Sequence, residues 1–258
     1  MAREIEGEES NQLTNEARIV VLYENADVVV IDKPSGMLVH EDGRSTEPTV
    51  VDWLRAHAPE SEGVGEPGRT PEGTLLERSG VVHRLDAETT GVLILAKTQD
   101  AFLHLKAQFH DRRVKKEYRA FVYGALKERW GTIRRVIGRS PRDFRLRSSE
   151  RGARGTLRPA VTHWEVLAQS NTHTYLKVTP ETGRTHQIRV HLKSIGKPIV
   201  HDRLYALPVQ VASGALQFDR LALHAHTLSI TTPDGVPRSF HAPLPPDFER
   251  AIALVAEE

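Results

Sequence analysis

The sequence predicts an α+β protein with more strands than helices. Short runs of β-branched and aromatic residues, bounded by turn residues, recur along most of the chain. Apolar residues at helical spacing occur in only a few short segments, and there is no internal repeat of fixed period. With 258 residues the chain is long enough to bury a substantial core. This length allows one large domain or two small ones, after a polar and acidic stretch at residues 1–17 that we expect to be a disordered tail.

The first expected elements are a strand pair and a helix. Residues 19–23 and 28–32 are β-rich runs separated by a polar turn, which predicts a hairpin or two short strands. Residues 49–57 carry apolar side chains at helical spacing, and Pro59 is expected to end that helix. The glycines and prolines within residues 61–77 indicate a flexible surface loop.

A buried strand and a helix come next. Residues 92–96 form a short, continuous apolar run between Gly91 and Lys97, which is typical of a strand inside the core. Asp100 is expected to cap the helix that follows. The expected inner face of this helix comprises Phe102, Leu103, Leu105 and Phe109.

The second half of the chain is predicted to be mostly strands. Residues 117–124 alternate as a strand, whereas residues 127–158 are basic with scattered glycine and proline and are expected to form irregular hairpins. The remaining expected elements are a hairpin of strands at 159–168 and 172–180, a helix at 186–195 ended by Gly196, strands within 221–230, a turn at 233–235 and a short helix that begins near Asp247.

Composition excludes several classes of protein. Cysteine is absent, so disulfides, thiol nucleophiles and cysteine-bound metals are excluded, which fits a reducing compartment. No window approaches the ~18 consecutive apolar residues of a membrane span. The N-terminus lacks the basic and then apolar plan of a secretory signal. We expect a cytoplasmic protein that does not contact a membrane.

The net charge of +1 conceals a strongly basic stretch between Arg112 and Arg158. This stretch contains sixteen basic and four acidic residues, an excess of twelve positive charges. Arginine pairs with phosphates bidentately and releases counterions on binding, so the stretch favours a polyanion partner over an ordinary solvated face.

The histidines do not predict a metal site. The candidate pairs are His186 with His191, which are five residues apart, and His224 with His226, which have no visible third ligand. The glycine-rich patterns of nucleotide-binding loops are absent, and no serine lies in a nucleophile elbow. We expect neither a metal nor a cofactor.

Two charged residues beside the expected turns have more than one interpretation. Asp86 lies just before the buried strand, where it could be a held, partly desolvated reactive group or only a cap of the turn. Lys33 could reach a phosphate, but coverage of apolar surface by its stem is the interpretation we favour.

Five motifs resemble those of the RluA/RluD-type pseudouridine synthases and occur in the same order. They are VIDKPSG at residues 30–36, HRLD at 83–86 with TTG at 89–91, KEY at 116–118, GRTHQIRVHL at 183–192 with Gly196, Pro198 and Asp202 after it, and LALHA at 221–225. The resemblance covers about residues 18 to 250 and implies a mixed, mostly antiparallel β-sheet with flanking helices and a central cleft. It also implies one catalytic domain over residues 18–258. It favours the reactive interpretation of Asp86.

The resemblance also implies a reaction and the residues that perform it. A uridine in RNA is detached from its ribose, turned, and rejoined through carbon 5, without a cofactor. Asp86 would attack the uracil ring or the sugar, or act as a base on the sugar, and Arg189 would be its charge partner. Tyr118 would stack on the target base and Arg84 would fill the space that the flipped nucleotide vacates, or else clamp a phosphate.

Further residues are expected to contact RNA or to support the site. His83 is expected to orient the loop rather than transfer protons. The residues expected to contact the RNA are Arg184, Arg134, Arg135 and Arg139. Many relatives carry a small RNA-binding domain ahead of the catalytic part, where this sequence has only its acidic stretch. We therefore expect substrate selection to rest on the catalytic domain.

The expected partner is structured RNA, and large-subunit ribosomal RNA is favoured over tRNA. A non-catalytic RNA-binding protein on the same fold is the alternative from another class, but it would need no carboxylate facing a polyanion. A glycosidase would need two carboxylates at the site, and no second one accompanies the motif. We expect the protein to be a monomer.

Overall fold

The computed structural model describes residues 19–257, except residues 44, 70–72, 74, 77, 144, 145 and 151. The tail expected at residues 1–17 therefore lies outside the described residues. The elements are β1 (Val20–Glu24), β2 (Val28–Lys33), α1 (Val50–His57), the 3₁₀ helix η1 (Pro59–Ser61), β3 (Gly68–Arg69), β4 (Leu75–Leu76), β5 (Thr90–Ala96), α2 (Gln99–His110), β6 (Lys115–Tyr123), β7 (Trp130–Arg139), β8 (Arg147–Ser148), β9 (Arg154–Gln169), β10 (His173–Pro180), α3 (Gln187–Ser194), α4 (Pro208–Ala212), the 3₁₀ helix η2 (Ala215–Gln217), β11 (Leu223–Thr231), β12 (Pro237–His241) and α5 (Pro246–Glu257).

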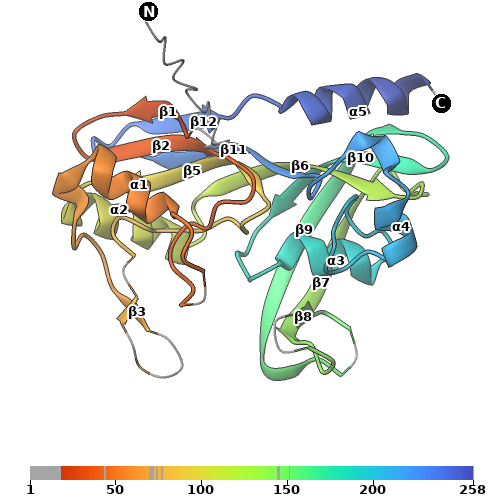
Figure 1. Cartoon of the computed structure of the whole chain (residues 1–258), viewed down its shortest axis with the longest axis horizontal. Coiled ribbons are helices and arrows are strands. Elements are labelled where there is room, and N and C mark those ends of the chain that lie inside the picture. The colour runs from red at the N-terminus through yellow and green to blue at the C-terminus, as the bar shows by residue number, and fades with distance from the viewer. Residues whose placement is uncertain are drawn as a thin grey trace, which may run out of the picture.

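One mixed sheet runs through the whole molecule (Figure 1). Its strand order is β1-β2-β5-β11-β6-β10-β9-β7-β8, and β12 pairs with β11. Only β5 and β11 pair in parallel among the described strands of this sheet, and every other pairing is antiparallel. The expected α+β class with a mostly antiparallel sheet is confirmed.

Helices cover both faces of the sheet where β2 and β5 lie. Val29 and Ile31 of β2 pack with α1, whereas Val28 and Val30 pack with α2. Alternate residues of a strand point to opposite faces, so two covered faces require a continuous apolar run rather than alternation. This explains why the run at residues 92–96 reads as a buried strand.

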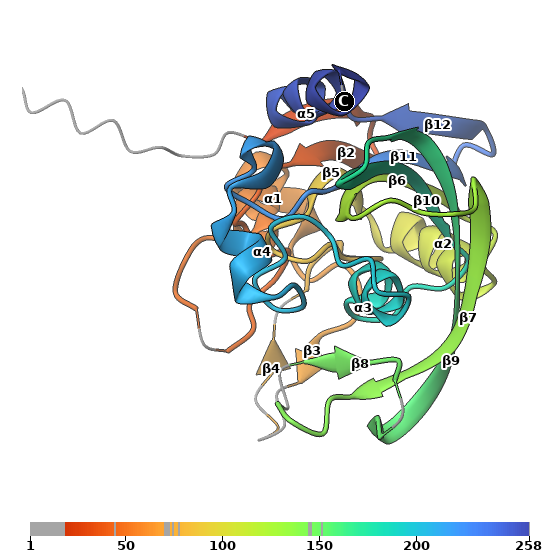
Figure 2. The same ribbon diagram turned by 90° about the vertical axis from the view of Figure 1, so that its right-hand side faces the viewer.

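The other half of the molecule is built on β6, β10, β9 and β7. Helix α5 lies along one face of this half and α3 lies on the opposite face, on the inner side of the long curved hairpin of β7 and β9 (Figures 1 and 2). Phe121 of β6 stacks on Tyr175 of β10 and contacts Phe248 of α5. Three aromatic side chains therefore join α5 to the sheet.

The structure corrects several expectations about local structure. The basic stretch is more regular than expected, because it forms the long strand β7 and the first residues of β9, which pair with each other. Ile133 and Ile137 of β7 are buried, whereas its arginines are exposed. The rest of β9 coincides with the strand expected at residues 159–168. Thr98, not Asp100, caps α2, and its hydroxyl accepts from the Ala101 amide. The expected loop at residues 61–77 includes the short hairpin of β3 and β4.

Smaller differences concern two helices. Leu103 was expected on the inner face of α2, but its side chain is 52% exposed. The helix α4 was not expected, because its five residues are too few to show a helical period. Across the described part of the chain, no helix is long and apolar enough to cross a membrane.

Candidate active site

The site lies where β5 and β11 run in parallel across the middle of the sheet. Gly91 of β5 pairs with Ala225 of β11, and Ala225 pairs on its other side with Tyr118 of β6. Gly91 has a φ of +113°, and a Cβ atom there would lie 2.2 Å from the Ala225 carbonyl oxygen. Only glycine fits at this close approach of β5 to β11. The two strand pairings place the loop before β5 beside Tyr118 of β6.

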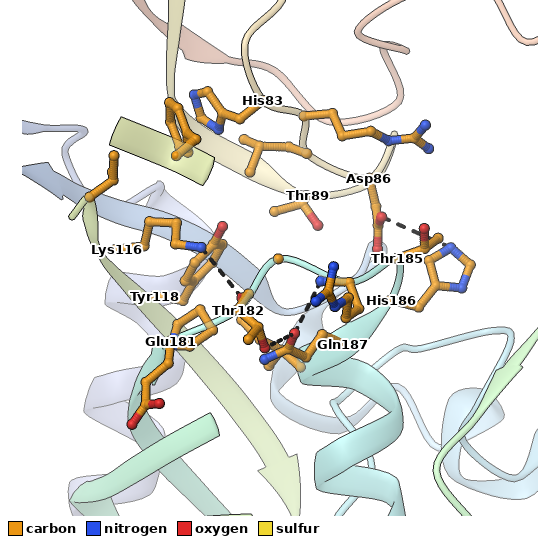
Figure 3. Close-up of a pocket in the computed structure, with 18 of the residues that line it drawn as sticks. His83, Asp86, Thr89, Lys116, Tyr118, Glu181, Thr182, Thr185, His186 and Gln187 are labelled. Atoms are coloured by element: carbon orange, nitrogen blue, oxygen red, sulfur yellow. Dashed lines mark hydrogen bonds and ion pairs between the residues drawn. The ribbon is translucent and has the colours of Figure 1, made fainter. Parts of the chain in front are cut away.

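A cavity of about 540 Å³ opens between the two halves of the molecule. Its walls are the loop that carries Asp86, the start of β6, and the turn at residues 180–186 that leads into α3 (Figure 3). Its volume lies within the range of roughly 300–1,000 Å³ that is typical of small-molecule sites. The cavity is therefore large enough for a small molecule or for one group of a larger ligand.

Asp86 points into this cavity from the loop before β5. Its side chain is 19% exposed, and its Oδ2 accepts a hydrogen bond from Arg189 Nη1 at 3.1 Å. The turn itself is closed by the main-chain oxygen of Asp86, which accepts from the Thr89 amide. The side chain of Asp86 is therefore not the turn cap that the sequence left open.

Arg189 is buried between two carboxylates. Its Nε and Nη2 donate to the two oxygens of Asp202 at 2.8 and 2.7 Å, which leaves Nη1 for Asp86. Burial alone would lower the pKa of Arg189, but the hydrogen bonds and charge of Asp202, with the charge of Asp86, raise it above the ordinary value. The arginine is therefore a permanent cation beside Asp86.

Tyr205 connects this ion-pair network to its surroundings. Its ring centre lies 5.1 Å from the Arg189 guanidinium carbon, and its hydroxyl lies 2.7 Å from His186 Nδ1. The other nitrogen of His186, Nε2, is 3.9 Å from Asp86 Oδ1. Burial lowers the pKa of His186, although the charge of Asp86 opposes this shift. At neutral pH the imidazole is a neutral neighbour of the carboxylate.

Lys33 holds the loop that carries Asp86. Its side chain is fully buried, and Nζ donates to the carbonyl oxygens of Pro34, Met37 and Ala87 at 2.6 to 2.8 Å. Burial lowers the pKa of Lys33 to about 7, whereas three carbonyl acceptors favour the ammonium, which alone has three hydrogens to donate. Lys33 neither covers surface nor reaches toward a phosphate, so both interpretations of it were wrong.

Tyr118 and His83 line the cavity in different ways. Burial, and then the charge of Asp86, raises the pKa of Tyr118 far above its ordinary value. His83 Nε2 accepts from the Ile94 amide at 3.1 Å, and its ring stacks on Phe109. Burial lowers the pKa of His83 to about 3, so it is neutral. These contacts agree with a loop-orienting role for His83.

A buried hydrogen-bond network supports the turn before α3. Gln187 Oε1 accepts from the Thr182 hydroxyl at 2.7 Å and from the Arg184 amide at 3.0 Å. The Gln187 amide group donates to the Val161 carbonyl and lies 3.0 Å from the Thr162 hydroxyl. This network fixes the wall of the cavity opposite Asp86.

The arginines expected to bind RNA do not form one surface. Arg84 is exposed at the edge of the cavity, which Arg184 also lines. Arg134 and Arg135 are neighbours on β7 and therefore point to opposite faces, and Arg135 donates to the Ser194 carbonyl. Arg139 lies at the far end of β7, beside a second cavity.

Two of the histidines considered as metal ligands bind other side chains instead. His191 Nδ1 lies 2.9 Å from the Thr162 hydroxyl, and His224 Nδ1 lies 2.9 Å from the Thr90 hydroxyl, so each has a protein partner.

A second carboxylate, Asp202, does lie at the site, contrary to expectation. Both of its oxygens bind Arg189, and it does not line the cavity, so it does not supply the second carboxylate of a glycosidase.

The chain is similar to known proteins over most of its length. A family model described as RNA pseudouridylate synthase matches residues 27–194. An uncharacterized RNA pseudouridine synthase of Synechocystis sp. is 38% identical over 241 residues, which cover 92% of this chain and 69% of that protein. Ribosomal large subunit pseudouridine synthase D of Xanthomonas campestris is 39% identical over 247 residues, which cover 92% of this chain and 70% of that protein.

A solved structure agrees with these similarities. Human RNA pseudouridylate synthase domain containing 1 superposes with a TM-score of 0.70 at 26% identity, and the match covers 89% of this chain and 84% of that one. The sequence and structural similarities therefore extend over both sides of the cavity.

Proposed function

This chain belongs to the RNA pseudouridine synthase family, and we propose that it isomerises uridines of large-subunit ribosomal RNA with Asp86 as its nucleophile. Members of this family are isomerases that convert uridine to pseudouridine in RNA. The observation that carries the proposal is the pair of Asp86 and Arg189, held at 3.1 Å at a cavity with room for one group of a larger ligand. The ribosomal substrate is supported by the names of relatives such as the Xanthomonas campestris protein.

The reaction needs one reactive carboxylate and no external reagent. The bond from uracil N1 to ribose C1′ breaks, the base turns, and a bond forms from C5 to C1′. A proton leaves C5 and a proton is taken up at N1, so the atoms balance without an oxidant or reductant. Asp86 Oδ1 accepts no hydrogen bond from the described residues, and this leaves it available to the ribose or to the uracil ring.

Arg189 supports the negative charge that this chemistry requires. Excluding water from the cavity would otherwise favour a neutral carboxyl group, because desolvation disfavours the charged form. A guanidinium at 3.1 Å offsets that cost, and Asp202 keeps the guanidinium in place. A non-catalytic RNA-binding protein would gain nothing from this arrangement, since a carboxylate at the binding surface repels phosphates.

Tyr118 is assigned to stacking on the uracil rather than to proton transfer. Its ring lines the cavity on the β6 side, and aromatic rings of this kind hold unstacked bases. The burial that raises its pKa makes its hydroxyl a poor proton acceptor at neutral pH. Arg84 is assigned to the space that the flipped nucleotide vacates, and its exposure at the edge of the cavity supports this assignment.

Asp86→Asn tests the nucleophile. The amide keeps the size of the carboxylate but cannot attack carbon, so we expect release of tritium from C5-labelled uridine to fall to background. The substrate is unmodified large-subunit ribosomal RNA transcribed in vitro. Affinity for this RNA should stay within about tenfold, because phosphate contacts dominate binding.

The control is Asp234→Asn, which removes a carboxylate from a surface ion pair with Arg238, outside the cavity. This variant should release tritium at the wild-type rate. Release by Asp86→Asn near that rate would contradict the role of Asp86. Release by the wild type from tRNA transcripts but not from ribosomal RNA would overturn the substrate and leave the chemistry intact.

A further inference from the structure

A second cavity of about 310 Å³ adjoins the first and shares one wall with it. The shared wall is the turn of Gly183, Arg184 and Thr185, whose residues line both cavities. The other walls are the ends of β7, β8 and β9, below α3 in Figure 2. The second cavity therefore lies directly across this turn from the place proposed for the uracil.

Four arginines line this second cavity, which we term the arginine pocket: Arg139, Arg147, Arg158 and Arg184. Strand pairing brings them together, since Arg139 lies opposite Arg147, and Arg158 lies opposite Ile137 two residues earlier on β7. Like charges directly opposite each other destabilise a sheet. No residue that lines the pocket is acidic.

Among the residues that the structure describes, no carboxylate neutralises the positive charges of the pocket. None of the four arginines forms an ion pair with a carboxylate among the described residues. Burial, and then the charges of Arg158 and Arg112, lower the pKa of Arg184. An arrangement that is unfavourable in the free protein is relieved when an anion binds.

We propose that the arginine pocket binds a phosphate of the substrate RNA backbone next to the target nucleotide. The proposal rests on the proposed function for the identity of the ligand as RNA. Planar guanidinium groups donate bidentately to phosphate oxygens, and the hydroxyls of Thr156 and Thr185 supply two further donors. With a phosphate on one side of the turn and the uracil on the other, the RNA strand crosses over Arg184.

The pocket is also connected to the catalytic pair. The main-chain amide of Arg147 donates to the Tyr205 hydroxyl at 2.9 Å, and the Tyr205 ring lies against Arg189. A phosphate held here fixes the backbone next to the nucleotide that must leave its stack. The pocket thus supplies the positioning contact for base flipping, whereas base recognition belongs to the first cavity.

The test uses the double variant Arg147→Gln with Arg158→Gln and a fluorescein-labelled hexauridylate as the probe. Neither arginine lines the catalytic cavity. We expect the variant to bind the probe roughly tenfold more weakly, with a salt slope shallower by about 0.7, the contribution of one phosphate on a single strand. Fluorescence anisotropy over a series of salt concentrations measures both quantities.

Three controls make the result specific. Arg250→Gln on α5 removes an exposed arginine that lines neither cavity, and it should bind like the wild type. The double variant Arg147→Lys with Arg158→Lys keeps the charge and should keep the wild-type salt slope, which separates lost charge from lost folding. A hexauridylate with an uncharged methylphosphonate backbone should bind equally to the wild type and the glutamine variant.

Two outcomes would overturn the proposal. One is an unchanged affinity and salt slope for the glutamine variant. The other is a loss of affinity that persists with the uncharged probe, since the pocket would then contact bases or sugars. Anisotropy does not depend on isomerisation, so failure of the tritium assay and failure of this test can be told apart.

Discussion

Asp202 determines which guanidinium nitrogen of Arg189 contacts Asp86. Its two oxygens accept from two of the three guanidinium nitrogens, and only Nη1 remains for Asp86. The main-chain amides of Leu204 and Tyr205 donate to Asp202 at 3.1 and 3.2 Å, which fixes this carboxylate in turn. Asp202 therefore positions the guanidinium, and Asp86 is left for the proposed nucleophilic role.

Asp202→Asn should weaken both the fold and the reaction. The variant leaves a buried guanidinium with only part of its compensation, which typically lowers the free energy of unfolding by about 3–5 kcal/mol. The isomerisation rate at saturating RNA should fall by about a hundredfold, because small misplacements of catalytic groups have effects of this size. Urea unfolding and single-turnover assays measure the two effects.

The matched control for this variant is again Asp234→Asn, which should change neither quantity appreciably because its ion pair with Arg238 is exposed. If Asp202→Asn isomerised RNA at the wild-type rate, Asp202 would have only a structural role. Rescue of the rate by the conservative change Asp202→Glu would support positioning.

At the residue scale the sequence predicts the residues that line the cavity better than the residues that hold them in place. Asp86, Tyr118 and Arg189 were named together from family motifs, and they do line one cavity. Asp202 stood within a motif, but nothing in the spacing shows that it holds Arg189. The hydrogen-bond partners of Lys33 are not predictable either, because a main-chain oxygen such as that of Ala87 is present in every residue.

At the scale of elements, strands with both faces covered were the easiest to predict. All seven residues of β5 are buried, and a continuous apolar run this short is typical of a strand rather than a helix. The strand β7 and the first residues of β9 are not predicted, because basic side chains are exposed along them and glycines interrupt them, as at Gly131, where the Trp164 ring packs against the strand. Composition alone therefore predicts irregular hairpins where the structure has a regular pair of strands.

Gly91→Ala should disrupt the crossing of β5 and β11. The added Cβ would lie 2.2 Å from a main-chain oxygen of Ala225, which cannot move without breaking the parallel pairing. The positive φ of Gly91 adds strain of about 1–3 kcal/mol for a residue with a side chain. We expect a loss of at least about 3 kcal/mol in the free energy of unfolding, measured by urea denaturation.

Gly235→Ala is the matched control for steric contact. Its φ is +79°, but a Cβ there would meet no atom within 4 Å. Only the backbone strain therefore lowers the free energy of unfolding in this variant. Equal losses in the two variants would mean that the close approach to Ala225 is unimportant. The difference between them measures the contribution of the strand crossing itself.

At the scale of the whole molecule, the contact between Asp86 and Arg189 depends on how the two halves are packed together. Asp86 comes from the loop before β5, and Arg189 comes from α3, which packs against the β7 and β9 hairpin (Figure 1). Only the central strands β11 and β6 connect the two halves within the sheet. Conditions that loosen this connection should therefore separate the pair before they unfold either half.

Acid should be such a condition, because three histidines are buried in the neutral form. Burial lowers the pKa of His83 to about 3 and lowers those of His191 and His224 to about 4. In the unfolded chain these groups titrate near their ordinary value of about 6.5. Between about pH 4 and 6.5 the unfolded chain therefore binds more protons, so stability falls as the pH is lowered through this window.

We expect urea denaturation to show this loss with a slope on the order of 3 kcal/mol per pH unit at its steepest. His191→Gln should reduce the slope by about a third, because glutamine can bond to the Thr162 hydroxyl and the Arg135 carbonyl without taking up a proton. His110→Gln, at a side chain that is 86% exposed, should leave the slope unchanged. A flat stability profile between pH 7 and 5 would show that the buried histidines do not couple protonation to unfolding.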